Sequence, residues 1–239
     1  MSDSLYIVVP AYNEAENIDR LVDDWYPIIE AHNGDGKSKL VVVDDGSKDD
    51  TYDLLMEFAK EKNQLIPITK PNEGHGPTVL FAYRYAIEND AGWIFQTDSD
   101  GQTDPSEFEQ FWQLRNEYDA IIGSRPDRQD GWLRKYVAKT LLIILSLIFG
   151  VKVPDANAPF RLMKRELVEK YISKIPEGFN LPNVMLTTYF AYFNEKIYFI
   201  NISFKPRQGG VNSVNIKKIV KIGWGALSDF RQLKKTIDD

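Results

Sequence analysis

Apolar strands and amphipathic helices alternate through the first 125 residues, and this alternation constrains the fold more than any other feature of the chain. Short apolar runs, such as Leu40–Val43, are typical of strands buried in a parallel sheet. Strands are predicted at residues 5–10, 40–43, 65–69, 92–97 and 120–122, and helices at 14–31, 51–60, 75–89 and 105–116. Strands joined through helices by short loops form a sheet covered on its faces by helices. The predicted fold class is therefore α/β, with a doubly wound sheet.

The remainder of the chain is predicted to be mainly helical. Helices are expected at residues 133–149, 165–174, 182–194 and 214–237, with one strand at 196–204. No repeat, low-complexity segment or obvious linker separates this part from the first. A length of 239 residues suits one sizeable domain. We therefore treat residues 1–125 and 126–239 as two halves of one domain.

Composition excludes several classes of function. The chain has no cysteine, so disulfides, thiolate metal sites and cysteine nucleophiles are excluded. His32 and His75 are the only histidines, which disfavours a Ser-His-Asp triad and a His-rich zinc site. The net charge of −6 argues against a nucleic-acid partner. Residues 5–10 are too short, and lack the basic start, for a signal sequence, so a cytoplasmic location is expected.

Pairs of carboxylates follow two of the predicted strands. Asp98 and Asp100, in the run Asp98-Ser99-Asp100-Gly101-Gln102, come directly after the strand at 92–97. Such hard oxygen ligands suit Mg²⁺ or Mn²⁺ that is also held by substrate phosphates, although a solvated acidic turn is the simpler alternative. Asp44 and Asp45 follow the strand at 40–43. Because ligands of α/β sheets bind at the carboxyl ends of the strands, the shared position favours a binding site.

Two further segments lie at predicted strand ends. Pro10 to Glu14 joins the first strand to the first helix, where capping alone would explain the residues. Asn72 to Gly76 opens the third helix, and glycines at a helix N-terminus allow a phosphate to approach the backbone closely. Asp44 and Asp45 could accept hydrogen bonds from a base and from ribose hydroxyls, with a capped turn as the alternative.

Four motifs occur in order along the chain: VVPAYNEAENI, VVVDDGSKDDT, the Asn-x-Gly helix start and DSDGQ. Together they resemble the nucleotide-sugar-binding half of the inverting glycosyltransferases of family 2, which have the GT-A fold. DSDGQ followed by Pro105 is especially similar to dolichyl-phosphate mannose synthases and other polyprenyl-phosphate glycosyltransferases. The resemblance implies that residues 1–125 bind the donor. It also implies that residues 126–239 form the acceptor side, with amphipathic helices near 132–149 and 214–237.

The resemblance implies roles for individual residues of the donor half. A base and ribose pocket, a phosphate-binding helix start and a cation site are expected. The residues implied are Pro10, Tyr12, Glu14, Asp44 and Asp45 for base and ribose, Asn72 and Gly74 for the helix start, and Asp98, Asp100 and Gln102 for Mg²⁺ or Mn²⁺. Negative charge develops on the leaving diphosphate, and a divalent cation stabilises it without proton transfer. Basic groups can share this work.

The acceptor half carries a less complete pattern. Gly123-Ser124-Arg125 matches the family, and the resemblance implies that Arg125 contacts a phosphate. Arg134 and Arg207 are further phosphate candidates, with a solvated helix start and a surface loop as the respective alternatives. The segment Asp155-Ala156-Asn157-Ala158-Pro159-Phe160-Arg161 resembles a family motif, but Pro159 stands where a glycine is usual, which removes a backbone donor and fixes φ.

The role expected of Asp155 depends on the acceptor. A hydroxyl acceptor needs a general base, and Asp155 is then the candidate. A lipid phosphate is already an anion, and Asp155 would then orient Arg161 or a sugar hydroxyl. Asp155, Arg125 and Arg161 are thus the predicted catalytic residues.

The uncharged run at residues 140–151 raises the question of a lipid contact. Twelve helical residues span about 18 Å, short of the roughly 30 Å bilayer core. The charged residues of 131–154, which include this run, are all lysines or arginines, and the same is true of residues 196–228. The segment could therefore lie in the membrane interface. A buried core helix, or a helix at a contact with a second copy, is the alternative.

The favoured function is metal-dependent, inverting transfer of one sugar from a UDP- or GDP-sugar to polyprenyl phosphate at the cytoplasmic membrane face. The chain lacks the Gln-x-x-Arg-Trp signature of processive relatives, which favours transfer of a single sugar. Transfer to a saccharide hydroxyl in surface-polysaccharide synthesis is the main alternative. A catalytically inactive nucleotide-binding regulatory protein is an alternative of another class. A nucleotidyltransferase is disfavoured, because no Gly-rich loop with a basic residue follows the first strand.

Overall fold

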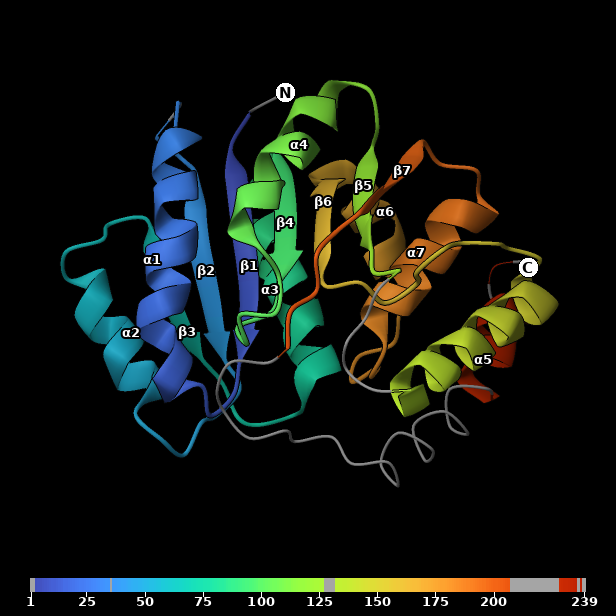
Figure 1. The fold of residues 1–239 in the computed structure, drawn as a ribbon, viewed down its shortest axis with the longest axis horizontal. Coiled ribbons are helices and arrows are strands. Elements are labelled where there is room, and N and C mark those ends of the chain that lie inside the picture. The colour runs from blue at the N-terminus through green and yellow to red at the C-terminus, as the bar shows by residue number, and fades with distance from the viewer. Residues whose placement is uncertain (1–2, 35, 127–131, 207–227, 236, 238–239) are drawn as a thin grey trace.

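The computed structural model describes residues 3–34, 36–126, 132–206, 228–235 and 237, and their core is one seven-stranded sheet. The strand order is β3-β2-β1-β4-β6-β5-β7 (Figure 1). The strands are β1 (Leu5–Ala11), β2 (Lys39–Asp44), β3 (Leu65–Thr69), β4 (Trp93–Thr97), β5 (Ala120–Ser124), β6 (Phe160–Lys164) and β7 (Ile197–Asn201). The pairs are parallel except where β6 meets β4 and β5. The predicted α/β class with a mostly parallel sheet is confirmed.

Helices cover both faces of the sheet. They are α1 (Ala15–Ala31), α2 (Thr51–Ala59), α3 (His75–Glu88), α4 (Phe108–Gln113), α5 (Trp132–Phe149), α6 (Arg165–Ile172) and α7 (Pro182–Tyr192). Short 3₁₀ turns at Pro105–Glu107 and Leu114–Asn116 flank α4, so the helix expected at 105–116 is divided into three pieces. Figure 1 shows α1 and α4 in front of the sheet and α3 and α6 behind it.

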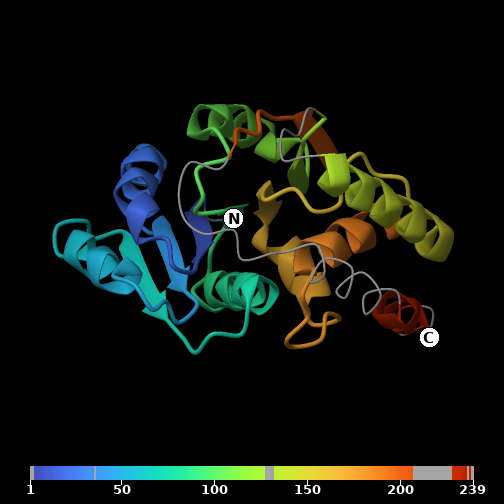
Figure 2. The same cartoon turned by 60° about the horizontal axis from the view of Figure 1, so that its bottom comes forward.

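Alternate residues of each central strand enter two separate cores, as the two-residue repeat of a strand requires. Leu5, Ile7 and Val9 pack in the core that includes α1 and α4. Tyr6 and Val8 pack in the core that includes α3, α5, α6, α7 and part of residues 228–235. The view of Figure 2 shows α5 on the far side of the molecule from α1 and α2. Both faces of β1 are thus buried, which explains its continuous apolar sequence.

Strand β6 was not predicted, and it shapes the second half of the chain. Arg161 and Lys164 interrupt its apolar pattern, so the segment carries no strand signal. It lies between β4 and β5, with Arg161 opposite Gln96 and Phe160 opposite Thr97. This pairing brings residues 155–161 beside the end of β4.

The carboxyl ends of β1, β2 and β4 lie at one edge of the sheet. Ala11 pairs with Asp44 at the ends of β1 and β2, and β4 pairs in parallel with the other side of β1. The segments that follow these strands therefore meet at this edge. No helix in the described part of the chain is long and apolar enough to cross a bilayer.

Candidate functional site

The turn after β1 is tied to the turn after β2. Asn13 has a left-handed backbone conformation, with φ of 52°. Its N–H donates to Ser47 Oγ at 2.8 Å, and its Oδ1 accepts from Lys48 N–H at 2.8 Å. The N–H of Glu14 donates to Thr51 Oγ1 at 2.9 Å. The two turns therefore form one rigid unit at the edge of the sheet.

Three predicted donor-binding residues lie in or beside this unit. Pro10 is buried within β1, and Tyr12 is half-buried in the turn. Glu14 is buried, and its Oε2 accepts from Asn17 Nδ2 at 2.5 Å. Tyr12 thus has the most accessible side chain of the three. Their contacts with base and ribose stay predictions.

Asp45 holds the loop between β3 and α3. Its buried carboxylate accepts from Lys70 Nζ at 2.7 Å, from Glu73 N–H at 3.0 Å and from Gly74 N–H at 2.8 Å. Its carbonyl oxygen accepts from Asn72 Nδ2 at 2.7 Å. Burial alone would raise the pKa of Asp45, but the hydrogen bonds from Lys70 and the loop backbone lower it below its ordinary value. Asp45, Asn72 and Gly74 therefore belong to one hydrogen-bonded cluster.

Asp44 and Gly46 complete this corner. Asp44 is buried and accepts from Ser47 N–H at 3.1 Å and from Thr69 Oγ1 at 2.7 Å. Gly46 has φ of +66°, and a Cβ there would lie 3.0 Å from Asn72 N. The position therefore favours glycine on both conformational and steric grounds. Within the described residues, both aspartates thus stabilise loops, and any contact with a nucleotide would add to these bonds.

Asp98 and Asp100 follow β4 at the same edge. Asp98 Oδ1 accepts from Gln96 Nε2 at 3.1 Å, and His75 Nε2 lies 3.8 Å from the same oxygen. Asp100 Oδ1 accepts from the N–H of Gln102 at 3.2 Å. Because His75 begins α3, its proximity places the start of that helix beside Asp98. The predicted phosphate-binding helix start and the predicted cation site therefore lie together.

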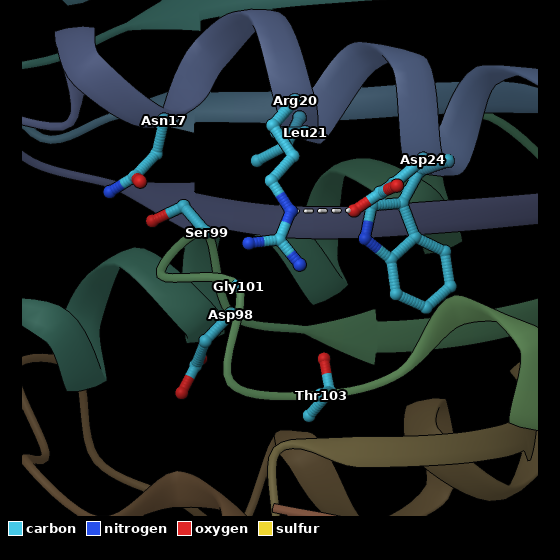
Figure 3. Close-up of a pocket in the computed structure, with 9 residues that line it drawn as sticks. Asn17, Arg20, Leu21, Asp24, Asp98, Ser99, Gly101 and Thr103 are labelled. Atoms are coloured by element: carbon cyan, nitrogen blue, oxygen red, sulfur yellow. Dashed lines mark hydrogen bonds and ion pairs between the residues drawn. The ribbon is translucent and has the colours of Figure 1, made fainter. Parts of the chain in front are cut away.

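Figure 3 shows a small pocket between α1 and the loop after β4. Arg20 points from α1 towards Gly101, where a Cβ would lie 3.1 Å from Arg20 Nη1. Arg20 also pairs with Asp24 at 3.2 Å, while Asp98 points away from α1 (Figure 3). Asp98 lines this pocket, but its carboxylate points away from α1.

The residues after β4 fit a divalent cation that shares its ligands with a substrate. Among the residues that the structure describes, no three acidic or histidine side chains converge on one point. Asp98 and Asp100 are two carboxylates in one loop, and they would offer hard oxygen ligands. Mg²⁺ commonly keeps several waters and binds through one or two carboxylates plus substrate phosphates. The two carboxylates therefore fit Mg²⁺ or Mn²⁺, which would take its remaining ligands from water and from the substrate.

Gln102 joins this loop to the segment after β7. It is buried, and its Nε2 donates to the Lys205 carbonyl at 2.9 Å while Lys205 N–H donates to the Gln102 carbonyl at 2.8 Å. Lys205 Nζ also pairs with Asp104 at 2.7 Å. The salt bridge with Lys205, helped by Ser106, lowers the pKa of Asp104 to about 2. Gln102 thus has a clear positioning role, and its amide oxygen is the atom that could face a cation.

Arg125 and Asp155 form a buried ion pair. Arg125 Nε lies 2.8 Å from Asp155 Oδ2, and Nη2 lies 3.1 Å from Oδ1. Only 5% of the Arg125 side chain and 12% of the Asp155 side chain are exposed. Arg125 also donates to the Asn157 carbonyl and lies over the ring of Phe204. The charge of Arg125 stabilises the ionised form of Asp155, which makes this carboxylate a weaker general base.

Arg161 is fully buried, which does not support the predicted catalytic role. Its five N–H groups are all used within the chain. The acceptors are the carbonyls of Ala156, Ala158 and Asn183 and the hydroxyl of Thr187. Asp155 bonds Arg125 rather than Arg161, contrary to the expectation for a lipid-phosphate acceptor. We therefore assign Arg161 a structural role.

Two predicted phosphate contacts cannot be placed. Arg134 lies in the first turn of α5, but its side chain is outside the described part of the structure. Arg207 also lies outside the described residues, as does most of the helix predicted at 214–237, of which 228–235 are helical. Both arginines stay predictions.

Three residues beside Asp98 were missed from the sequence: Gln96, Asn183 and Tyr83. They are buried and hydrogen-bonded to one another. The one available signal was Gln96, a polar residue inside an otherwise apolar strand. Nothing in the sequence pairs it with a residue 87 positions later.

Comparison with known proteins identifies a family model and relatives that are sugar transferases. The model of the family described as Glycosyl transferase family 2 matches residues 6–172. The undecaprenyl-phosphate 4-deoxy-4-formamido-L-arabinose transferase of Proteus mirabilis is 24% identical over 225 residues, which are 93% of this chain and 66% of that protein. A dolichyl-phosphate beta-glucosyltransferase of Trichomonas vaginalis is 29% identical over 177 residues, 68% of this chain and 53% of that protein. The chain thus spans two thirds or less of these relatives.

A solved structure shows the same fold. The crystal structure of glucosyl-3-phosphoglycerate synthase from Mycobacterium tuberculosis, in complex with Mn²⁺ and UDP-glucose, superposes with a TM-score of 0.69. The alignment covers 97% of this chain and 79% of that one, at 16% identity. At this identity the likeness concerns the fold.

Proposed function

The chain belongs to glycosyl transferase family 2, and on that premise we propose that it transfers one sugar from a nucleotide diphosphate sugar to a polyprenyl phosphate. The observation that carries the proposal is the position of Asp98, with Asp100 in the same loop, beside the start of α3 and at the same edge as the turns after β1 and β2. Residues 1–125 would bind the donor, and residues 126–239 would bind the acceptor.

The donor half has the chemistry that a UDP- or GDP-sugar requires. Tyr12, Asp44 and Asp45 would contact base and ribose, and the start of α3 would lie near the diphosphate. Asp98 and Asp100, with the amide oxygen of Gln102, would hold Mg²⁺ or Mn²⁺. When bound, such a cation stabilises the negative charge that develops on the leaving diphosphate.

The Arg125–Asp155 pair favours a phosphate acceptor over a hydroxyl. A polyprenyl phosphate oxygen is already an anion and can attack the anomeric carbon as the bond to the diphosphate breaks, with inversion and without a general base. A saccharide hydroxyl would need a base, and both oxygens of Asp155 accept hydrogen bonds from Arg125. In this proposal, Asp155 holds the guanidinium of Arg125 in position to bind the acceptor phosphate.

One face of α5 suits the surface of an anionic membrane. Its exposed apolar residues Tyr136, Ile143 and Leu147 are 69%, 59% and 81% exposed and recur at helical spacing. Lys139 and Lys152 are exposed nearby, and residues 131–154 contain no acid. The opposite face packs in the core through Leu145 and Phe149. An interfacial helix with this pattern would bring the site to a lipid-linked acceptor at the inner face of the cell membrane.

A transfer assay tests the proposal. The protein is incubated with Mn²⁺, a panel of radiolabelled UDP- and GDP-sugars, and either undecaprenyl phosphate or a saccharide acceptor, followed by extraction into organic solvent. We expect labelled lipid from one donor, and no product from the Asp100→Asn variant. A product found only in the aqueous phase would contradict the lipid acceptor. Binding without transfer to either acceptor would favour a regulatory protein.

Vesicle sedimentation tests the membrane contact separately. Vesicles that contain phosphatidylglycerol should sediment the wild-type protein more than neutral vesicles do. The double variant Ile143→Ser, Leu147→Ser should lose this binding, because it removes two of the exposed apolar side chains of this face. Met56→Ser, at an exposed apolar position on α2, is the matched control and should bind normally. Equal sedimentation of all three proteins would contradict the assignment.

A further inference from the structure

A chain of buried polar side chains leads from Asp98 into the core. Gln96, on β4, donates from Nε2 to Asp98 Oδ1 at 3.1 Å. Its Oε1 accepts from Asn183 Nδ2, on α7, at 2.8 Å. Asn183 Oδ1 then accepts from the hydroxyl of Tyr83, on α3, at 2.7 Å. Gln96 and Tyr83 are fully buried and Asn183 nearly so.

The direction of every bond in this chain is fixed. An ionised carboxylate only accepts hydrogen bonds, so Gln96 must present its amide nitrogen to Asp98 and its oxygen to Asn183. Asn183 must then present its own oxygen to Tyr83. Burial raises the pKa of the Tyr83 phenol well above its ordinary value, so the hydroxyl stays protonated and donates. Each amide therefore has one orientation that satisfies both of its neighbours.

The middle of the chain is anchored on both sides. Arg161, which pairs with Gln96 across β4 and β6, donates from Nη1 to the Asn183 carbonyl at 3.1 Å. Thr187 Oγ1 donates to the same carbonyl at 2.9 Å. Asn183 is thereby fixed at both its backbone and its side chain. The anchor comes from the acceptor half of the chain, whereas Asp98 belongs to the donor half.

Buried polar chains of this kind have a cost unless every member is satisfied. Here side chains from α3, β4 and α7 bond one another, Arg161 of β6 holds the backbone of Asn183, and the series ends on one half-buried carboxylate. Groups behind a metal ligand commonly fix its orientation, and their loss lowers metal affinity 10- to 100-fold. Asp98 is the one member of the chain at the surface edge, with 26% of its side chain exposed.

We propose that Gln96, Asn183 and Tyr83 are positioning residues that orient the Asp98 carboxylate for the divalent cation of the donor site. This inference rests on the proposed function, since it requires a cation at Asp98. It adds a physical link between the two halves of the chain, because α7 fixes a cation ligand that follows β4. If these three side chains served packing alone, their substitution would lower the stability of the protein and leave its affinity for the cation unchanged.

Calorimetric titration of MnCl₂ into the protein, with saturating UDP or GDP, tests this role without measuring activity. In Gln96→Met the donor to Asp98 is lost at similar side-chain length, and the dissociation constant for Mn²⁺ should rise about tenfold or more. In Tyr83→Phe only the far end of the chain is removed, and a rise on the order of threefold is expected. Tyr189→Phe is the matched control, because the buried Tyr189 hydroxyl has no hydrogen-bond partner among the described residues.

A third variant separates orientation from packing. Asn183→Asp keeps the shape of the side chain but cannot donate to Gln96 Oε1, so it favours the reversed orientation of the Gln96 amide. The amide oxygen would then face Asp98, and Mn²⁺ affinity should fall even where the melting temperature does not. Circular dichroism of each variant identifies any that fail to fold, and Tyr83→Phe, which deletes one oxygen, keeps the test decisive.

The outcomes distinguish the two proposals. Wild-type protein that binds no Mn²⁺ with either UDP or GDP would overturn the proposed function and, with it, the positioning role. Wild-type protein that binds Mn²⁺, with unchanged affinity in folded Gln96→Met, Asn183→Asp and Tyr83→Phe, would overturn the positioning role alone. A graded loss of affinity, with Tyr189→Phe unchanged, supports the inference.

Discussion

Replacing Asp45 by asparagine should destabilise the protein because the carboxylate is the centre of the loop after β3. It accepts three hydrogen bonds, from Lys70 Nζ and from the N–H groups of Glu73 and Gly74. An asparagine has one acceptor oxygen, so its NH₂ group must face at least one of these donors. Asp45→Asn therefore leaves a buried donor unsatisfied and removes the charge opposite Lys70.

The expected loss of stability follows from the contacts that the substitution removes. An unsatisfied buried donor costs about 1–3 kcal/mol. Breaking a buried ion pair costs about 3–5 kcal/mol, but Lys70 keeps a second partner, since Glu73 Oε2 lies 2.9 Å from its Nζ. These two effects overlap, because they concern the same atoms. We therefore expect a loss of about 2–4 kcal/mol in the free energy of unfolding at pH 7.

The pH dependence of this loss follows from the lowered pKa of Asp45. The folded-state pKa lies below the ordinary value of about 3.9, so the contribution of the carboxylate is fully present above that pH. It is lost as the pH falls through the folded-state pKa. The asparagine variant does not titrate at this site. The stability difference between the two proteins should therefore be constant from about pH 8 to pH 5 and should narrow below about pH 4.

Urea unfolding followed by circular dichroism, at several pH values, measures this difference. Asp50→Asn is the matched control, because Asp50 is exposed and its side chain makes no capping bond to α2. It should change the free energy of unfolding by less than about 0.5 kcal/mol. A difference of that small size for Asp45→Asn, or a difference that persists unchanged to pH 3, would refute the assignment of Asp45 as the centre of the loop.

Three further predictions concern single residues. Gly76→Ala should lower the free energy of unfolding by about 1–3 kcal/mol or more in urea titration, because its Cβ would lie 2.5 Å from backbone atoms of the facing loop. The Asp104 carboxyl should titrate with a midpoint of about 2 in NMR, owing to Lys205, and a midpoint near 4 would disprove the salt bridge. Arg125→Lys should cost about 1–3 kcal/mol in thermal unfolding, because lysine cannot bond both oxygens of Asp155; an unchanged melting temperature would contradict the pairing.

The parts of the fold that repeat a local pattern could be predicted from the sequence. Strand β3 begins and ends where predicted, and β1, β2 and β4 agree to within a residue. Each is a continuous apolar run bounded by polar turns. Strand β6 carries two basic residues whose charges are satisfied only by tertiary contacts, so periodicity could not detect it. The 3₁₀ turns around α4 were likewise hidden in a helical pattern.

Some residues of the candidate site could likewise be predicted from the sequence, whereas their tertiary contacts could not. The carboxylates at the ends of β2 and β4 were found because a motif and a strand end coincide in the sequence. Their partners could not be found, since Lys70 bonds Asp45 from 25 residues away and Asn183 fixes the Gln96 amide that bonds Asp98. The burial of Arg161 was missed for the same reason. Which arginine lies in the core depends on the position of β6, and the sequence carries no signal for that strand.

Calorimetric titration with a panel of UDP- and GDP-sugars, with and without Mn²⁺, tests the central claim most directly. The account predicts that one nucleotide sugar binds, that Mn²⁺ strengthens its binding, and that Asp100→Ala abolishes the effect of Mn²⁺ while the circular dichroism spectrum is unchanged. Failure of every nucleotide sugar to bind would contradict the account, as would an Mn²⁺ effect that survives in Asp100→Ala.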